Sequence, residues 1–369
     1  MIDFLKNYGR QVTGLILLLI FAFFFTDILI YILIATFLSI LGSPMVRWLD
    51  EKKKLKHPVS VFITFFTIIL IFVVFILFIV PLIIYQANII SSIELDQLIQ
   101  HYRDSFQKIN EFLIQYNIVN PEQSFISWLQ QQLGELVDVA RFTNIFTSLV
   151  STTGSVVMGT FITLFLTFYF LLDDSLVKRF MLLMTPENFY HDMESVLHHS
   201  KELLVRYFYG ILMEVGIMMT IESTALLILD VPNAILIGFL GGLLNIIPYL
   251  GPLLGATIGM LLAGLSELAY GSYGDVFSSV MSVAVVFLGA NLIDNIILQP
   301  QIYSKSVKAH PVEIFLVIII GGRLAGVVGM IFAIPVFTVI KVVAYQLKDR
   351  IDKNRNTGEK AKVVAENEI

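Results

Sequence analysis

The sequence predicts an all-α, polytopic helical membrane protein with about eight hydrophobic segments, including broken or re-entrant helical hairpins. Hydrophobic residues make up 57% of the 369 residues and charged residues only 14%, whereas a soluble protein has about 25% charged residues. The apolar residues also occur in blocks long enough for a bilayer, which a helix crosses with about 20 mostly apolar residues. The chain has no cysteine, which excludes disulfides, thiolate metal sites and thiol redox chemistry. Its small net charge of −5 and the lack of a basic block indicate no nucleic-acid partner.

The N-terminal part, residues 1–85, is expected to contain a membrane hairpin, a basic cytoplasmic loop and a long span. The first apolar block, 14–41, is interrupted at Thr26-Asp27 and is either one kinked span or a hairpin of two short helices. Basic residues precede this block and also cluster in 47–56. Because short cytoplasmic loops are rich in Lys and Arg, both flanks are predicted to be cytoplasmic, which favours the hairpin. The uncharged run 59–85 is the next span.

Three further regions follow from changes in composition. Residues 86–147 are polar with spaced apolar residues, and seven acidic residues outnumber three basic ones, which predicts an extracytoplasmic amphipathic helical insert. Residues 148–346 are expected to form the main transmembrane domain, with a cytoplasmic helical segment at 173–206. Residues 347–369 form a charged cytoplasmic tail, so both termini are predicted to be cytoplasmic.

The last hydrophobic segment, 314–340, is interrupted by Gly321-Gly322-Arg323. Basic residues on both sides of it, Lys308 and Lys341, favour the cytoplasm. The segment is therefore expected to cross and return as a two-part hairpin or re-entrant element. Short, broken segments of this kind are a feature of transporters.

Three motifs carry a resemblance to a known family. The first is Asp294-Asn295-Ile296-Ile297-Leu298-Gln299-Pro300, which is followed by Ser304-Lys305-Ser306-Val307-Lys308-Ala309-His310-Pro311. The other two are Asn245-Ile246-Ile247-Pro248-Tyr249-Leu250-Gly251-Pro252 and Gly329-Met330-Ile331-Phe332-Ala333-Ile334-Pro335-Val336. Together they resemble the autoinducer-2 exporter family of bacterial inner-membrane permeases, also described as PurR-regulated permeases. The resemblance implies a multi-pass protein of the bacterial inner (plasma) membrane. It also implies export of a small signalling molecule of the autoinducer-2 type.

The first motif places a carboxylate among amides. Asn291, Asp294, Asn295 and Gln299 have the spacing i, i+3, i+4 and i+8, so an α-helix would carry them along one polar stripe. A carboxylate at membrane depth costs at least about 2.5–3.5 kcal/mol and persists where it pairs with a cation, holds a proton or lines water. Asp294 is thus predicted to couple transport to an ion. The alternative is a helix-end charge at the cytoplasmic interface.

The second motif interrupts the uncharged block 231–266. Pro248 and Pro252 remove backbone donors, and such a break is tolerated in a membrane only inside protein or along a cavity. Asn245 and the backbone near Gly251 would then line a site between two half-helices near mid-membrane. The alternative is a kinked span or a tight turn between two spans. Glycines repeat at four-residue spacing on both sides of the break and predict close helix contacts.

Charged residues elsewhere complete the candidate set. Glu214 and Glu222 lie eight residues apart in the apolar stretch 207–229, where they either face a protonation pathway or pair with polar neighbours. Arg323 is either their counter-charge or an interfacial residue whose head reaches water. The predicted substrate and ion pathway therefore consists of Glu214, Glu222, Asn245, Pro248, Gly251, Pro252, Asn291, Asp294, Asn295, Gln299 and Arg323.

No enzymatic motif occurs: there is no zinc-protease helix, nucleophile elbow or phosphate-binding loop, and no metal-ligand spacing. The sequence predicts a non-enzyme with no cofactor other than a coupling ion, H⁺ or Na⁺. Three functions remain open. They are a secondary transporter that exports a small polar solute or signalling molecule, a Na⁺/H⁺ antiporter, and a non-transporting membrane scaffold. The partners expected are the lipid bilayer, a small solute or ion and, because of the glycine-rich faces, further copies of the chain.

Overall fold

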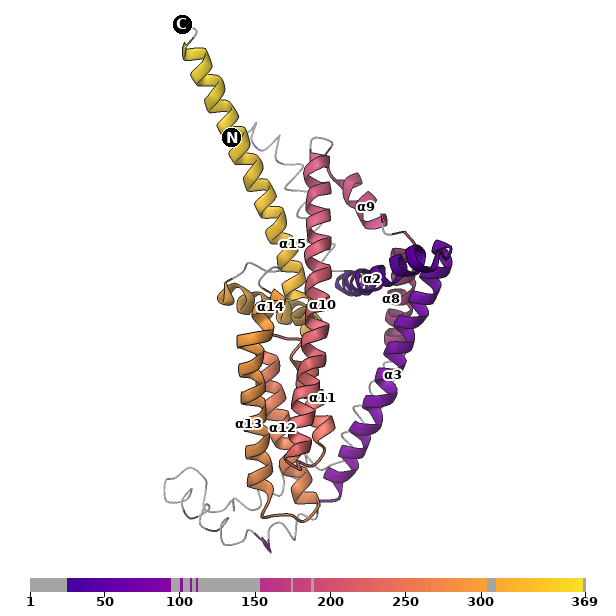
Figure 1. Cartoon of the computed structure of the whole chain (residues 1–369), viewed down its shortest axis with the longest axis vertical. Coiled ribbons are helices and arrows are strands. Elements are labelled where there is room, and N and C mark those ends of the chain that lie inside the picture. Colours follow the sequence, from indigo (N-terminus) through magenta and orange to yellow (C-terminus); the bar gives the residue numbers. More distant parts are fainter. Residues whose placement is uncertain are drawn as a thin grey trace. The chain divides into compact units, whose positions relative to one another are not determined.

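The computed structural model describes residues 25–93, 153–173, 175–186, 189–303 and 310–367, with four further positions between 100 and 111. Every regular element in these residues is helical, as predicted (Figure 1). The elements are α2 (Thr26–Lys53), α3 (His57–Ser91), α8 (Thr153–Leu172), α9 (Leu176–Met184), α10 (Tyr190–Ile228), α11 (Ala234–Leu244), α12 (Leu250–Ala269), α13 (Val276–Ile293), the π-helical turn η2 (Asp294–Leu298), α14 (Gln299–Tyr303) and α15 (Pro311–Asn367).

The lengths and hydropathy of these helices fit a multi-pass membrane protein. Six described helices are long and apolar enough to cross a membrane, or seven if α8 and α9 together count as one bent span. The short apolar helix α11 comes in addition. Side chains along α3 that would be buried in a soluble protein are exposed, for example Leu77 at 68% and Ile71 at 64%. Such a surface suits lipid rather than water.

The chain forms two compact units. One comprises residues 1–71, 155–211 and 301–369, and the other, which we call the α11–α13 unit, comprises 72–154 and 212–300. In the α11–α13 unit, α12 lies between α11 and α13 (Figure 1). Its core is built around Leu226, Ile237, Ala263, Val283 and Phe287.

Glycines allow the helices of the α11–α13 unit to approach closely. A Cβ on Gly238 or Gly242 would lie about 2.5 Å or less from the backbone of Ser223 or Met219 in α10. On the opposite side, a Cβ on Gly255 would lie 3.1 Å from Gly241 Cα. The predicted role of the four-residue glycine spacing in close helix contact is therefore confirmed.

In the other unit, the basic segment predicted as a loop is mostly helical. α2 continues to Lys53 and ends with Lys54 in the left-handed conformation, whose N–H bonds to Leu49 O. Only residues 54–56 separate α2 from α3. The predicted first hairpin lies partly outside the described residues: α2 begins at Thr26, the expected interruption, and residues 1–24 are not described.

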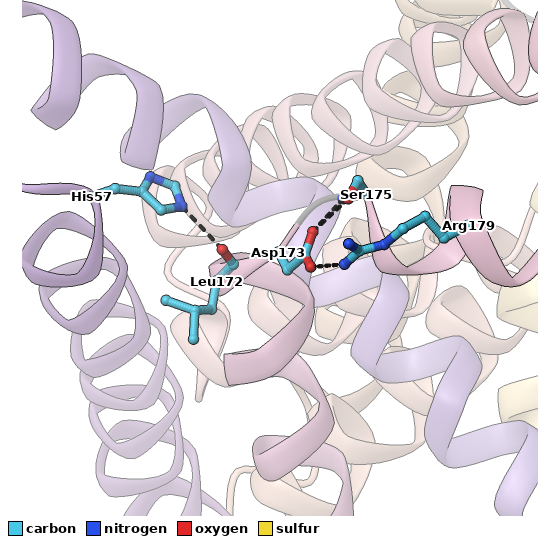
Figure 2. A network of polar contacts seen from close by, with 5 residues as sticks. All are labelled: His57, Leu172, Asp173, Ser175 and Arg179. Atoms are coloured by element: carbon cyan, nitrogen blue, oxygen red, sulfur yellow. Dashed lines mark hydrogen bonds and ion pairs between the residues drawn. The ribbon is translucent and has the colours of Figure 1, made fainter.

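A polar network holds the α2–α3 turn against the end of α8 (Figure 2). The ring of His57 contacts Asp50 Oδ2 at 2.7 Å through Nδ1 and the carbonyl of Leu172 at 3.1 Å through Nε2. One residue further, Asp173 accepts hydrogen bonds from the N–H and hydroxyl of Ser175 and forms an ion pair with Arg179. Asp173 thus fixes Ser175, the residue that precedes α9, without itself capping the first turn of that helix.

The terminal segment breaks and folds back. Ala325 and Gly326 are non-helical, and Gly326 has a φ of 58°, which glycine adopts without strain. A Cβ on Gly321 would lie 2.4 Å from Gly329 O, although eight residues of continuous helix would separate them by about 12 Å. At the open end, Lys341 donates to Glu313 at 3.0 Å. The predicted two-part hairpin is present, with both of its ends on the same side.

Candidate functional site

The break between α11 and α12 reverses the chain. Asn245 continues the backbone bonding of α11 through its N–H to Gly241 O, and Gly251 N–H bonds back to Ile247 O at 2.8 Å. The two helices then run side by side. α11 has 11 residues and rises about 16 Å, too short for an ordinary span of about 30 Å. The break is therefore a tight turn between a short and a long helix rather than the meeting of two half-helices.

Both prolines are compatible with this reversal. Pro252 is the third residue of α12, where a backbone N–H has no partner within the helix and its loss costs nothing. Pro248 lies in the turn itself and is half-buried. The predicted site lined by the backbone between two half-helices therefore does not follow from this geometry, because neither proline interrupts a helix interior.

Tyr249 has a strained backbone in the middle of the turn. Its φ and ψ are 66° and −48°, and the N–H of Leu250 bonds to the carbonyl of Pro248 at 2.8 Å. This is the rare γ-turn with positive φ. A non-glycine residue held in such a region costs on the order of 1–3 kcal/mol and is most often found at functional sites.

Facing this turn, the helix that contains Asp294 changes type. α13 gives way to five π-helical residues, Asp294–Leu298, and π-helical turns are frequent at functional sites. The side chain of Asp294 is 0% exposed, and its Oδ2 accepts a 2.8 Å hydrogen bond from Gln299 Nε2. Its Oδ1 is buried with no hydrogen-bond partner. A buried carboxylate with one unsatisfied oxygen is unlike a solvated helix-end charge.

The remaining amides of the stripe face outward. Asn295 Nδ2 donates to both the backbone carbonyl and Oδ1 of Asn291, each at 2.8 Å. Asn295 is exposed, whereas Asn291 and Gln299 are half-buried. The predicted single stripe therefore divides, with Asp294 directed into the protein and the three amides toward a pocket.

That pocket lies between the start of α12 and the end of α13. Its volume is about 250 Å³, slightly below the range of about 300–1,000 Å³ typical of drug-sized ligand sites. It combines amides with apolar and aromatic walls. The lining residues are Tyr249, Pro252, Leu253, Ala256, Phe287, Leu288, Asn291, Asn295 and Gln299.

A second carboxyl, Glu222 of α10, is buried in the same unit at 3% exposure. The side chain lies against α11, where a Cβ on Gly241 would come within 2.2 Å of Glu222 Oε2. That oxygen has no hydrogen-bond partner, and the carboxyl interacts electrostatically with Asp294. Two buried carboxyls that repel each other favour the uptake of a proton or a cation, since like charges in a low-dielectric site repel strongly.

Asn245 is also buried, at 3% exposure, and its Nδ2 lacks a partner. Gly242 of α11 lies against Met219 of α10. Glu214 precedes Met219 by five residues in α10, so the helix register places Glu214 at the level of the turn that follows α11. Glu214 is 2% exposed. Glu222, Asp294 and Asn245 thus contribute three buried polar side chains with unsatisfied atoms.

Two predicted residues take different places. Gly251 is buried in the first turn of α12, where a Cβ would lie 2.0 Å from Leu244 O, so its role is to allow the reversal. Arg323 is exposed, two residues before the break of the terminal hairpin at Ala325, and belongs to the other unit. Its role as a counter-charge stays a prediction.

The aromatic and apolar walls of the pocket are not among the residues predicted from the sequence. Phe287 precedes Asn291 by four residues and Asn295 by eight, so helical spacing already placed it on the amide face. Tyr249 was part of the recognised motif but was not singled out. Among the described residues, no cluster of three or more His, Cys, Asp or Glu side chains could hold a metal ion.

Comparison with known proteins assigns the family. The model of a family described as AI-2E family transporter matches residues 13–349. The chain belongs to the AI-2E transporter family. Among the relatives, YrrI of Bacillus subtilis (strain 168) is 26% identical over 345 residues, which cover 89% of this chain and 92% of YrrI. The AI-2 transport protein TqsA of Escherichia coli (strain K12) is 23% identical over 338 residues, 88% of this chain and 87% of TqsA.

Family membership and the helices together make this AI-2E family chain a multi-pass membrane transporter or permease. Its bilayer environment and a small-molecule substrate follow from that membership. The family match extends over both compact units, so the buried carboxyls and the amide-lined pocket lie within the matched region.

Proposed function

We propose that this protein is a secondary transporter that exports a small polar solute of the autoinducer-2 type through the pocket at the α11–α12 turn. The observation that carries the proposal is the amide-lined pocket, in which Gln299 both lines the cavity and bonds the buried Asp294. Three amides can bind the hydroxyl groups of a small polar solute, while Tyr249 and Phe287 provide apolar walls. The relative TqsA, named as an AI-2 transport protein, supports this substrate class.

Export is proposed to be coupled to H⁺ or Na⁺ at Asp294 and Glu222. Both carboxyls are buried, and each has one oxygen without a hydrogen-bond partner. When the pair binds a proton or a hard cation, the repulsion between the carboxyls is relieved. Gln299 would transmit this change to the pocket, because its side chain touches both sites. We place the protein in the bacterial inner membrane with both termini in the cytoplasm.

A Na⁺/H⁺ antiporter is the second candidate, and the buried pair of carboxyls favours it. In that case the carboxyls exchange one ion for the other, and the pocket is part of the aqueous path to them. A non-transporting scaffold would instead use the glycine-rich faces for packing between copies, and would need neither carboxyl.

Reconstitution of the purified chain into sealed vesicles tests these functions. Gradient-dependent flux of an autoinducer-2-type furanone diol is the expected result. A sodium-driven change of internal pH without solute flux would show that the protein is an antiporter and not an exporter. If vesicles show neither activity under an imposed sodium or pH gradient, the proposal of transport through this site is wrong. Asp275→Asn, at the exposed start of α13, is the matched control for variants of Asp294.

A further inference from the structure

A basic pocket lies between α2 and α10, in the unit that does not contain the proposed transport site. Its volume is about 510 Å³, within the usual range for small ligands. Two helix faces line it: positions 43, 44 and 47 of α2, and positions 198, 201, 202, 205 and 206 of α10. The lining residues are Ser43, Pro44, Arg47, His198, Lys201, Glu202, Val205 and Arg206.

Packing contacts hold the two walls of this pocket in place. Tyr209 donates from its hydroxyl to the carbonyl of Leu41 at 2.7 Å, which joins α10 to α2 beside the cavity. The rings of Phe208 and Phe37 meet edge to face with 4.2 Å between centroids. Pro44 removes a backbone donor within α2, and a proline inside a helix bends it. The pocket is therefore fixed by direct contacts between α2 and α10.

The charge of the pocket is positive. The residues that line the pocket include three cations, Arg47, Lys201 and Arg206, and one carboxylate, Glu202, so the lining carries a net charge of +2 at neutral pH. Glu202 accepts a 2.7 Å hydrogen bond from Arg206. Guanidinium groups match phosphate oxygens with paired hydrogen bonds, and lysine adds a point charge. This combination suits an anionic oxygen group such as a phosphate better than a neutral solute.

The pocket lies where both helices change from apolar to charged. α2 is apolar before Ser43 and carries Arg47, Asp50 and several lysines after it. α10 is charged up to Arg206 and apolar from Tyr207 onward. Trp48 and Tyr209 are exposed at this level, as aromatic residues commonly are at a membrane interface. A helix pair with this pattern places the pocket at the depth of the lipid headgroups.

We propose that this pocket binds the phosphate of an anionic phospholipid from the surrounding bilayer. Basic pockets between membrane helices on the cytoplasmic side bind the headgroups of anionic lipids through the same chemistry. A soluble phosphate ester offers similar oxygens, but it is not held at the interface by acyl chains. The lipid joins α2 to α10 by bridging Arg47 on one helix to Lys201 and Arg206 on the other.

Thermal unfolding of the purified full chain in detergent micelles tests the proposal. The midpoint is measured with added phosphatidylglycerol, phosphatidylcholine or soluble glycerol phosphate at equal concentrations. Phosphatidylglycerol should raise the midpoint, and the other two should not. The triple variant Arg47→Gln, Lys201→Gln, Arg206→Gln should bind this lipid about 100-fold more weakly. The control triple variant Lys52→Gln, Lys54→Gln, Lys56→Gln loses the same charge outside the pocket and should behave like the original chain.

Glu202→Gln gives a test of opposite sign that does not depend on the folding of the triple variant. Removal of the carboxylate from the described lining of the pocket should strengthen retention of phosphatidylglycerol, measured by native mass spectrometry. Equal protection of the triple variant and the original chain, or weaker retention in Glu202→Gln, overturns the proposal. Protection by glycerol phosphate equal to that by the lipid would assign the site to a soluble phosphate ester instead.

Discussion

Gln299 Nε2 donates a 2.8 Å hydrogen bond to Asp294 Oδ2, five residues earlier on a π-helical turn. An α-helix brings residues three and four apart together, so this contact at a spacing of five depends on the local change of helix type. Because Gln299 also lines the pocket, one side chain connects the solvent-accessible amides to the buried carboxyl. This connection gives the proposed coupling a physical basis.

Asp294→Asn should abolish ion-dependent flux and leave folding nearly unchanged. The amide oxygen of the variant can still accept from Gln299, while the charge and the repulsion with Glu222 are lost. Vesicle flux with and without a sodium or pH gradient measures the effect. Asn295→Ala, which removes a pocket amide only, should weaken solute affinity and keep the coupling. If flux through the Asp294→Asn protein still follows the gradient, Asp294 has no coupling role.

Gln299→Ala should destabilise the protein by about 1–3 kcal/mol, because it leaves the buried carboxylate of Asp294 without a donor. In the background of Asp294→Asn the same substitution should cost clearly less, since a neutral amide needs that donor less than a carboxylate does. Thermal unfolding of the two single variants and the double variant gives the coupling energy. Additive effects would show that the hydrogen bond contributes little.

Gly241→Ala should destabilise by about 1–3 kcal/mol through overpacking. The new Cβ would lie 2.2 Å from Glu222 Oε2 and 2.5 Å from Phe287 Cζ, so the carboxyl has to move. Loss of ion coupling should accompany the fall in the unfolding midpoint. Gly289→Ala in α13, where nothing lies within 4 Å of the new Cβ, is the control and should have little effect on either. A Gly241→Ala protein as stable as that control would contradict the close contact.

Tyr249→Gly should separate stability from transport. Glycine adopts the positive φ without strain, which favours the folded state, but it removes the aromatic wall of the pocket. We expect an unchanged or higher unfolding midpoint together with reduced solute flux. Tyr249→Phe retains the ring and the strain, and should transport like the original chain. A lower midpoint in Tyr249→Gly would mean that ring packing outweighs the backbone strain.

The absence of cysteine allows a direct test of topology by single substitutions. Of Ser124→Cys, Lys53→Cys and Asn356→Cys, only the first should react with a membrane-impermeant thiol reagent on intact cells. The reason is that the basic α2–α3 turn and the segment after the terminal hairpin are predicted to be cytoplasmic. Permeabilised cells serve as the control for reactivity. Reaction at position 356 in intact cells would place the C-terminus outside.

Much of the fold could be predicted because hydrophobic length and charge act locally. The span expected at 59–85 lies within α3 (His57–Ser91). The terminal hairpin was predicted from the basic residues on both sides of it and from Gly321-Gly322. In each case the residues that determine the element lie within one helix or directly beside it.

The site was less predictable because its geometry depends on contacts between helices. The reversal at Pro248 requires α11 to pack on α12 through Gly241 and Gly255. The position of a proline in the sequence does not predict such a contact between helices. The prediction assumed α-helical spacing and therefore assigned Asp294 to the same face as Asn295. The π-helical turn changes that spacing. In the structure Asp294 is fully buried, whereas Asn295 is exposed.

The position of the pocket at the start of α12 has an electrical consequence. α12 has 20 residues and rises about 30 Å, close to the full hydrocarbon thickness of a bilayer. With α12 spanning the bilayer, the pocket and Asp294 would lie toward one membrane face, and the turn between α12 and α13 toward the other. In the proposed coupling, an ion that leaves Asp294 along α12 would cross nearly the whole membrane potential, about 2.3 kcal/mol per elementary charge for each 100 mV. In a transport cycle through this pocket, the voltage-sensitive step would be exchange with the side of the α12–α13 turn, and binding at the pocket itself would be almost independent of voltage.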